Sequence, residues 1–265
     1  TFKGKAGRGA IGQVLIAFDE HIGREVALKE LLPDRPSGSG PSTGRSRSRL
    51  TAEATARFIR EARVTGQLEH PGIVPVYEIA RRDDESIYYT MKLVRGKTLE
   101  DRLKSCKSLH DRLRLLPHFL DLCQAVAYAH SKGVVHRDLK PANVMVGEFG
   151  ETVVLDWGLA KVRGVEDVRA EELAENLKLI KDARASETVK GQPIGTPAYM
   201  SPEQAEGKIE EIDERSDVWG LGAILYEILT GGPPFPGNYS YEVMGRVISE
   251  TPAPVVEIEP KAPPE

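Results

Sequence analysis

Residues 134–146 read VVHRDLKPANVMV, in which two apolar runs enclose a polar and charged centre. The polar side chains are those of His136, Arg137, Asp138, Lys140 and Asn143. Such a centre would destabilise the interior of a strand or helix, because a buried charge without a partner costs several kcal/mol. Two interpretations follow: a surface loop between two core strands, or a catalytic loop that its apolar flanks hold rigid. The rest of the chain distinguishes between them.

The composition is that of an ordinary globular chain, with 265 residues, of which 40% are hydrophobic and 29% charged. This length suffices for one large domain or two small lobes. A net charge of −4 predicts no general affinity for nucleic acid or anionic membranes. Neither a signal peptide nor an apolar run of roughly 20 residues is present, so we expect a cytoplasmic location. The two cysteines, Cys106 and Cys123, lack metal-ligand spacing.

The first part of the chain is rich in strand signals. Five segments predict strands: 3–7, 13–19, 25–32, 72–80 and 86–94. Residues 51–69 predict a helix that carries Phe58, Ala62 and Thr65 on one face and Glu61 one step away. The Pro/Gly/Ser/Arg tract 34–49 buries too little apolar surface to order itself, so we interpret it as a flexible insertion. A plain linker is favoured there over a cluster of regulatory phosphosites.

The character of the sequence changes after Gly96. Residues 117–131 and 217–229 have helical apolar patterns, whereas 251–265 is Pro-rich and predicted to be irregular. A β-rich part, 1–94, therefore precedes a mostly helical part, 95–265. This order indicates an α+β protein with two lobes and a cleft between them.

Two features of the β-rich part suggest phosphate binding. Gly7, Gly9, Gly12 and Val14 form a G-x-G-x-x-G-x-V pattern. A dinucleotide-binding turn shares this spacing but leads into a helix, whereas a predicted strand follows here. The glycines fit a hairpin whose backbone lies over phosphates, although an ordinary glycine-rich hairpin remains open. Lys29 ends an apolar strand and should face an anion, for which Glu61 and nucleotide phosphates are candidates.

Three motifs together resemble those of protein kinases. Residues 136–143, HRDLKPAN, resemble the H-R-D-L-x-x-x-N catalytic loop; DWG at 156–158 resembles D-F-G; and SPE at 201–203 resembles A-P-E. The resemblance extends from Gly7 to about residue 250. Stretches such as GTPAYMSPEQA are similar to the bacterial eukaryotic-like Ser/Thr kinases, which commonly carry further repeat or membrane-anchored domains. The resemblance to protein kinases implies an α+β, two-lobed fold, with one main helix in the β-rich N-lobe and a mostly helical C-lobe.

The resemblance also implies roles for individual residues. Asp138 would accept the proton of a substrate hydroxyl, and Lys140 would reach the γ-phosphate of ATP. Asn143 and Asp156 would supply oxygen ligands to Mg²⁺, and Lys29 would pair with Glu61. The implied ATP site consists of Gly7, Gly9, Gly12, Val14, Ala27, Lys29, the gatekeeper Met91, the hinge residues Lys92–Val94, and Met145.

A long activation segment, 156–203, follows by the same resemblance. Within it, EELAENLKLIKDA (171–183) predicts a short helix, and Thr196 would contact Asp138 and Lys140. Ser186 and Thr188 are candidate autophosphorylation sites, and Arg137 would pair with a phosphate on this segment. We expect His136 to pack and hydrogen-bond within the catalytic loop. Asp217 would bind the backbone of that loop.

The sequence departs from the kinase pattern at several positions. Trp157 stands in place of Phe, and Thr65 is polar where an apolar residue is usual. The arginine that normally pairs with Glu203 would lie beyond Glu265, so the chain is interpreted as a fragment of a longer kinase, and Glu203 is expected to lack that partner.

The leading hypothesis is a Ser/Thr protein kinase that uses Mg·ATP, acts on protein substrates including its own activation segment, and self-associates for that purpose. The alternative is a pseudokinase scaffold, which would usually have lost one of the key residues. A small-molecule phosphotransferase is disfavoured by Lys140 and the GTPAYMSPE stretch.

Overall fold

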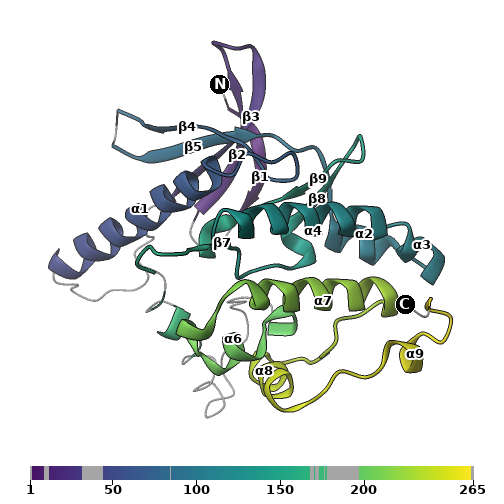
Figure 1. The fold of residues 1–265 in the computed structure, drawn as a ribbon. Coiled ribbons are helices and arrows are strands. Elements are labelled where there is room, and N and C mark those ends of the chain that lie inside the picture. The colour runs from purple at the N-terminus through teal and green to yellow at the C-terminus, as the bar shows by residue number, and fades with distance from the viewer. Residues whose placement is uncertain are drawn as a thin grey trace. The chain divides into compact units, whose positions relative to one another are not determined.

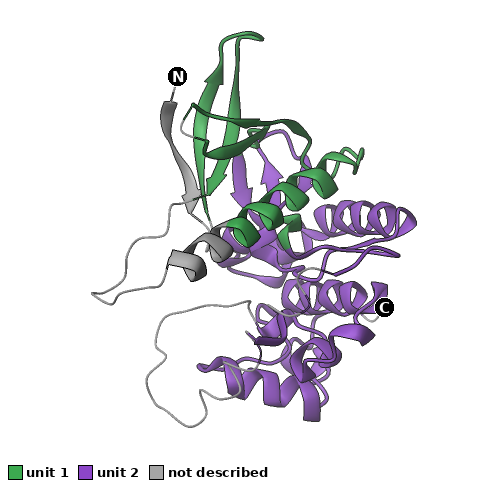
Figure 2. Ribbon diagram, turned by 90° about the vertical axis from the view of Figure 1, so that its left-hand side faces the viewer, with its two compact units in different colours: residues 1–95, 156–158 green, residues 96–155, 159–265 purple. Residues whose placement is uncertain are grey.

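A computed structural model describes residues 2–8, 12–31, 44–83, 85–167, 170, 173–175, 177 and 197–263. The chain forms two compact units (Figure 2), one of residues 1–95 with 156–158 and the other of residues 96–155 with 159–265. The sequence-based division at 94/95 placed residues 156–158 in the second part. They group with the first because Asp156 binds Lys29 and Gly158 lies against the Glu61 carboxylate. Among the described residues, no helix is both long and apolar enough to cross a membrane.

Unit 1 is a five-stranded antiparallel sheet with one long helix (Figure 1), and the strand order is β1-β2-β3-β5-β4. The elements are β1 (Phe2–Arg8), β2 (Gly12–Asp19), β3 (Arg24–Leu31), α1 (Gly44–Gly66), β4 (Val76–Arg81) and β5 (Ile87–Lys92). All five predicted strands are present. The helix packs Phe58 and Ala62 against Ile87 and Tyr89 of β5, which confirms the predicted apolar face.

Helix α1 begins at Gly44, which corrects the predicted flexible insertion 34–49 and the predicted helix start at residue 51. Helix propagation adds one hydrogen bond for each residue fixed, and arginine is a good helix former. The tract GRSRSR therefore extends a helix whose apolar half is anchored on the sheet. Residues 34–43 lie outside the described part of the chain.

Unit 2 is mostly helical. Its helices are α2 (Leu99–Ser105), α3 (Leu109–Leu113), α4 (Leu116–Ser131), α6 (Pro202–Glu206), α7 (Glu214–Thr230), α8 (Ser240–Ser249) and α9 (Val255–Ile258). The strands β6 (Gly96–Thr98), β8 (Val144–Gly147) and β9 (Thr152–Val154) form one small sheet, and β7 (Val134–Val135) pairs with β10 (Lys161–Val162). Short 3-10 turns cover Pro141–Asn143, Trp157–Leu159, Pro197–Tyr199 and Ile209–Glu211.

The two helices predicted in unit 2 are confirmed as α4 and α7. Pro117 occupies the first turn of α4, and Gly133 follows its end with φ of 72°, in the left-handed region. Helix α7 starts earlier than predicted because Asp213 caps it, accepting a hydrogen bond from the Arg215 N–H. The Pro-rich tail 251–265, predicted to be irregular, contains the single turn α9. Residues 170, 173–175 and 177 are helical, and the rest of the helix predicted at 171–183 lies outside the described residues.

Candidate active site

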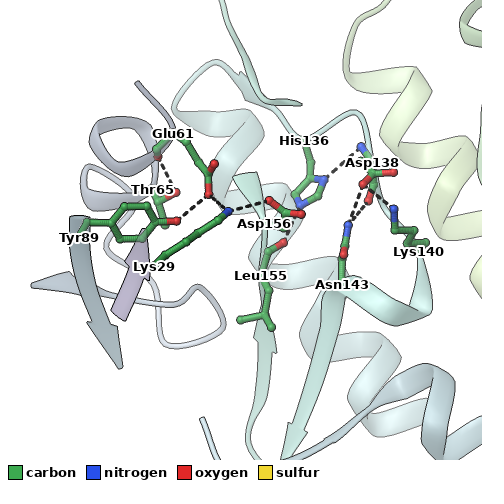
Figure 3. Close-up of polar contacts among 10 residues, drawn as sticks. All are labelled: Lys29, Glu61, Thr65, Tyr89, His136, Asp138, Lys140, Asn143, Leu155 and Asp156. Atoms are coloured by element: carbon green, nitrogen blue, oxygen red, sulfur yellow. Dashed lines mark hydrogen bonds and ion pairs between the residues drawn. The ribbon is translucent and has the colours of Figure 1, made fainter. Parts of the chain in front are cut away.

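In unit 1, Lys29 on β3 and Glu61 on α1 form an ion pair, with 2.5 Å between Nζ and Oε1 (Figure 3). The Tyr89 hydroxyl on β5 donates to the same carboxylate oxygen over 2.6 Å. Thr65, one turn further along α1, donates its hydroxyl to the Glu61 carbonyl oxygen over 2.8 Å. The hydroxyl of Thr65 therefore has a hydrogen-bond partner although the residue is buried. Strand β3 and helix α1 together fix the Lys29 ammonium.

Asp156 is the second carboxylate near this ammonium, with 3.5 Å between its Oδ1 and Lys29 Nζ. Burial lowers the pKa of Lys29, but the charges of Asp156 and Glu61 together outweigh burial and raise the pKa above its ordinary value. Lys29 is therefore a stable cation at neutral pH. The Asp156 side chain is 51% exposed and has φ of 59°, in the left-handed region.

In unit 2, Asp138, Lys140 and Asn143 converge in the loop between β7 and β8. Lys140 Nζ donates to Asp138 Oδ2 over 2.7 Å, and Asn143 Nδ2 donates to the same oxygen over 3.0 Å. The Asn143 amide also donates to the Asp138 carbonyl oxygen over 2.9 Å. The carboxylate of Asp138 is held by two side chains from its own loop (Figure 3).

The backbone of this loop is fixed from below by Asp217 on α7. Its carboxylate accepts hydrogen bonds from the His136 and Arg137 N–H groups, each over 2.8 Å, and contacts His130 Nε2 over 2.8 Å. Arg137 has φ of 68°, a conformation rare for a non-glycine residue, so this loop needs such fixation. Asp217 thus binds the loop backbone, which confirms the contact predicted from the sequence.

His136 is fully buried and serves the loop structurally. Its Nδ1 accepts from the Asp138 N–H over 3.2 Å, and its Nε2 lies 3.1 Å from the Leu155 carbonyl oxygen. A ring that accepts at Nδ1 donates at Nε2, which fits the neutral tautomer. This arrangement agrees with the packing role expected from the sequence.

The Arg137 guanidinium is engaged by the chain itself. It binds both carboxylate oxygens of Asp167, and its Nε donates to the Leu159 carbonyl oxygen over 2.6 Å. The kinase resemblance predicts a phosphate as the partner of Arg137. In this structure the partner is a carboxylate.

Comparisons with known proteins agree with this geometry. The family described as "Protein kinase domain" matches residues 1–263. The chain belongs to that family. It is 38% identical over 240 residues to Serine/threonine-protein kinase PknD of Protochlamydia amoebophila, covering 86% of this chain and 23% of the relative. Over 245 residues it is 40% identical to the PknD of Chlamydia muridarum, covering 86% of this chain and 24% of the relative. The kinase domain thus spans about a quarter of the length of these relatives, and the expected kinase fold class is confirmed.

The residues expected to bind ATP in this kinase domain lie on defined elements. In unit 1, Val14 pairs with Lys29 across β2 and β3, and Ala27 pairs with Met91 across β3 and β5. Met145 lies on β8 in unit 2. The hinge residues Lys92 and Val94 are at and just beyond the end of β5. Their roles remain predictions.

The glycine pattern is only partly described. Gly7 pairs with Val14 across β1 and β2, whereas Gly9 lies outside the described residues, as does Thr196. At Gly12 a Cβ atom would lie 2.4 Å from the Glu30 carbonyl oxygen. The close approach of two strands therefore requires glycine there, independently of any phosphate.

Sequence reasoning missed three contacts in the kinase domain. These contacts join residues that are far apart in the sequence and belong to no local motif. They are the hydrogen bond from Tyr89 to Glu61, the contact of His130 with Asp217, and the ion pair of Asp167 with Arg137. A fourth finding concerns Glu203, which was expected to lack its usual arginine partner. Its carboxylate accepts a hydrogen bond from the Ser216 hydroxyl, because α6 and the start of α7 bring the two residues together.

Proposed function

We propose that this kinase domain is catalytically active and transfers the γ-phosphate of Mg·ATP to serine and threonine hydroxyls of proteins, including its own activation segment. The observation that carries the proposal is the fixed position of the Asp138 carboxylate. Lys140 and Asn143 both donate to this carboxylate, and Asp217 fixes the backbone of the same loop. Phosphoryl transfer depends on positioning and charge neutralisation, and such a preorganised loop supplies both.

Asp138 is the residue that would align the incoming hydroxyl and accept its proton. Within the described residues, both side-chain bonds to Asp138 fall on Oδ2, so Oδ1 is the oxygen available to the substrate. Lys140 balances the negative charge of Asp138 and would contact the transferred phosphate. A lysine two residues after the aspartate resembles the Ser/Thr-directed kinases and not the tyrosine-directed ones, so serine and threonine hydroxyls are the expected acceptors, in agreement with the names of the relatives.

The donor chemistry fits Mg·ATP. Asn143 uses its amide nitrogen for both bonds to Asp138, which leaves its oxygen for a ligand. Asp156 offers a carboxylate that is half exposed. Oxygen donors of these two types suit Mg²⁺, so Asn143 and Asp156 would hold the metal. Bound Mg²⁺ would neutralise charge on the phosphate oxygens.

Lys29 would bind the α- and β-phosphates of ATP, held in place by Glu61 and kept charged by the two neighbouring carboxylates. The adenine ring would contact Val14, Ala27, Met91 and Met145, and the hinge residues Lys92–Val94 would bind it through their backbone. Self-association of two copies would bring one activation segment to the other copy's site. These assignments follow the family and remain proposals.

The pseudokinase alternative is not supported, since Lys29, Glu61, Asp138, Asn143 and Asp156 are all present. The proposal is tested by incubating the chain with Mg·ATP and a peptide mixture that offers serine, threonine and tyrosine separately. We expect phosphoserine and phosphothreonine as the products. Tyrosine phosphorylation, or labelling of ATP hydrolysis products alone, would contradict the proposal.

A further inference from the structure

The Arg137 guanidinium binds a carboxylate from its own chain. Its two terminal nitrogens bind the two oxygens of Asp167, an arrangement in which the planar fork of arginine matches a carboxylate. The third nitrogen, Nε, donates to the Leu159 carbonyl oxygen over 2.6 Å. All of these residues belong to unit 2.

Both members of this pair are shielded from water. The Arg137 side chain is 0% exposed and that of Asp167 is 12% exposed. A guanidinium cannot lose its charge in a protein, so a buried one requires an anion beside it. Asp167 supplies that anion without any modification of the chain.

The pair lies next to the proposed catalytic base. Arg137 immediately precedes Asp138, its N–H binds Asp217, and its carbonyl oxygen accepts from Gln204 Nε2 over 2.7 Å. Its φ of 68° leaves little freedom for the peptide that joins it to Asp138. The side-chain bonds of Arg137 to Asp167 and to the Leu159 carbonyl oxygen add to this fixation, directly beside the proposed base Asp138.

We propose that Asp167 is a positioning residue that takes the part of an activation-segment phosphate, so that phosphoryl transfer proceeds with an unphosphorylated segment. The inference rests on the proposed function. To reach Arg137, a phosphate on the activation segment would have to displace the shielded, bidentate carboxylate of Asp167. Phosphorylation of residues such as Ser186 or Thr188 therefore has other consequences than switching the catalytic loop on.

The test compares two preparations of the full chain, one treated with a phosphatase until mass spectrometry finds no phosphate and one preincubated with Mg·ATP. Initial rates are measured on a Ser/Thr peptide. We expect the two wild-type preparations to agree in kcat within about twofold. Asp167→Asn should lower kcat by about tenfold to a hundredfold with little change in the KM for ATP, because the base is misplaced while the nucleotide site is intact.

Two further variants separate positioning from a general loss of structure. Asp167→Glu keeps the charge and should recover part of the rate that Asp167→Asn loses. Glu210→Gln removes an exposed carboxylate from the same unit and should leave kcat unchanged. Circular dichroism confirms that each variant is folded before its rate is compared.

Each unfavourable outcome has a distinct meaning. A dephosphorylated wild type that is inactive beside an active phosphorylated one would overturn the inference and leave the proposed function standing. An Asp167→Asn variant faster than wild type would also overturn it, because the pair would then restrain the loop. Absence of transfer from both wild-type preparations would overturn the proposed function itself.

Discussion

Glu61 positions the Lys29 ammonium through its carboxylate. One of its carboxylate oxygens accepts both the Lys29 ammonium and the Tyr89 hydroxyl, over 2.5 and 2.6 Å. The side chain is only 7% exposed, so these bonds act in surroundings of low dielectric. A charge-assisted bond of this kind is stronger than one between neutral groups. Lys29 is positioned by Glu61 before any nucleotide binds.

Glu61→Gln should therefore weaken the Lys29 site without removing the lysine. The neutral amide no longer attracts the ammonium, and one of the two charges that raise the Lys29 pKa is lost. We expect kcat/KM for ATP to fall by about tenfold to a hundredfold, with a rise in KM, in the range of a lost charged hydrogen bond. Steady-state kinetics with varied ATP measures this. Glu78→Gln, which changes an exposed residue on β4, is the matched control, and equal kinetics for both variants would contradict the assignment.

Helix α7 supplies the carboxylate that fixes the backbone of the loop 136–143. Its Asp217 is 1% exposed and accepts three hydrogen bonds, two from backbone N–H groups and one involving His130. Asp213 immediately precedes the same helix, and its carboxylate caps the first turn at the surface. One helix thus carries two aspartates with different tasks.

Asp217→Asn and Asp213→Asn make the same chemical change at these two positions. An amide has one accepting oxygen instead of two, so Asp217→Asn leaves a buried N–H group unsatisfied and should lower the free energy of unfolding by about 2–3 kcal/mol. Asparagine caps helices as well as aspartate does, so Asp213→Asn should cost less than about 0.5 kcal/mol. Urea unfolding followed by circular dichroism compares them. Equal losses would show that Asp217 is an ordinary helix residue.

Helix α4 should make the protein sensitive to acid through His118. Its Nδ1 lies 3.0 Å from the Thr152 hydroxyl, which donates to Asp121 over 3.1 Å. Burial lowers the pKa of His118, opposed by Asp121 and assisted by Arg102. Between this lowered pKa and the ordinary value of about 6.5, the unfolded chain binds more protons than the folded one, so stability falls as the pH falls.

His118→Gln should remove this contribution. We expect the loss of unfolding free energy between about pH 7 and pH 5 to become smaller in the variant, since glutamine does not titrate. Urea unfolding at several pH values gives the slope. His110→Gln, at an exposed position on α3, should keep the slope of the wild type, and a slope left unchanged by His118→Gln would refute the prediction.

For the molecule as a whole, sequence predicted what is encoded locally. Strands β1 to β5 and helices α4 and α7 follow from apolar periodicity, and the loop 136–143 follows from a contiguous motif. Contacts between distant segments were out of reach: nothing near Asp167 indicates that it meets Arg137, and nothing near Ser216 indicates that it meets Glu203. The start of α1 was also missed, because its first turns lack an apolar face.

The measurement that tests the central claim most directly is the rate of γ-phosphate transfer from Mg·ATP by wild type and by Asp138→Asn. Asparagine keeps the shape of the side chain but cannot accept the substrate proton. We expect the wild type to phosphorylate a Ser/Thr peptide and the variant to be slower by about a hundredfold to ten-thousandfold, the usual contribution of general base catalysis. Equal rates for the two proteins, or no transfer by the wild type, would contradict the account of this chain as an active kinase domain.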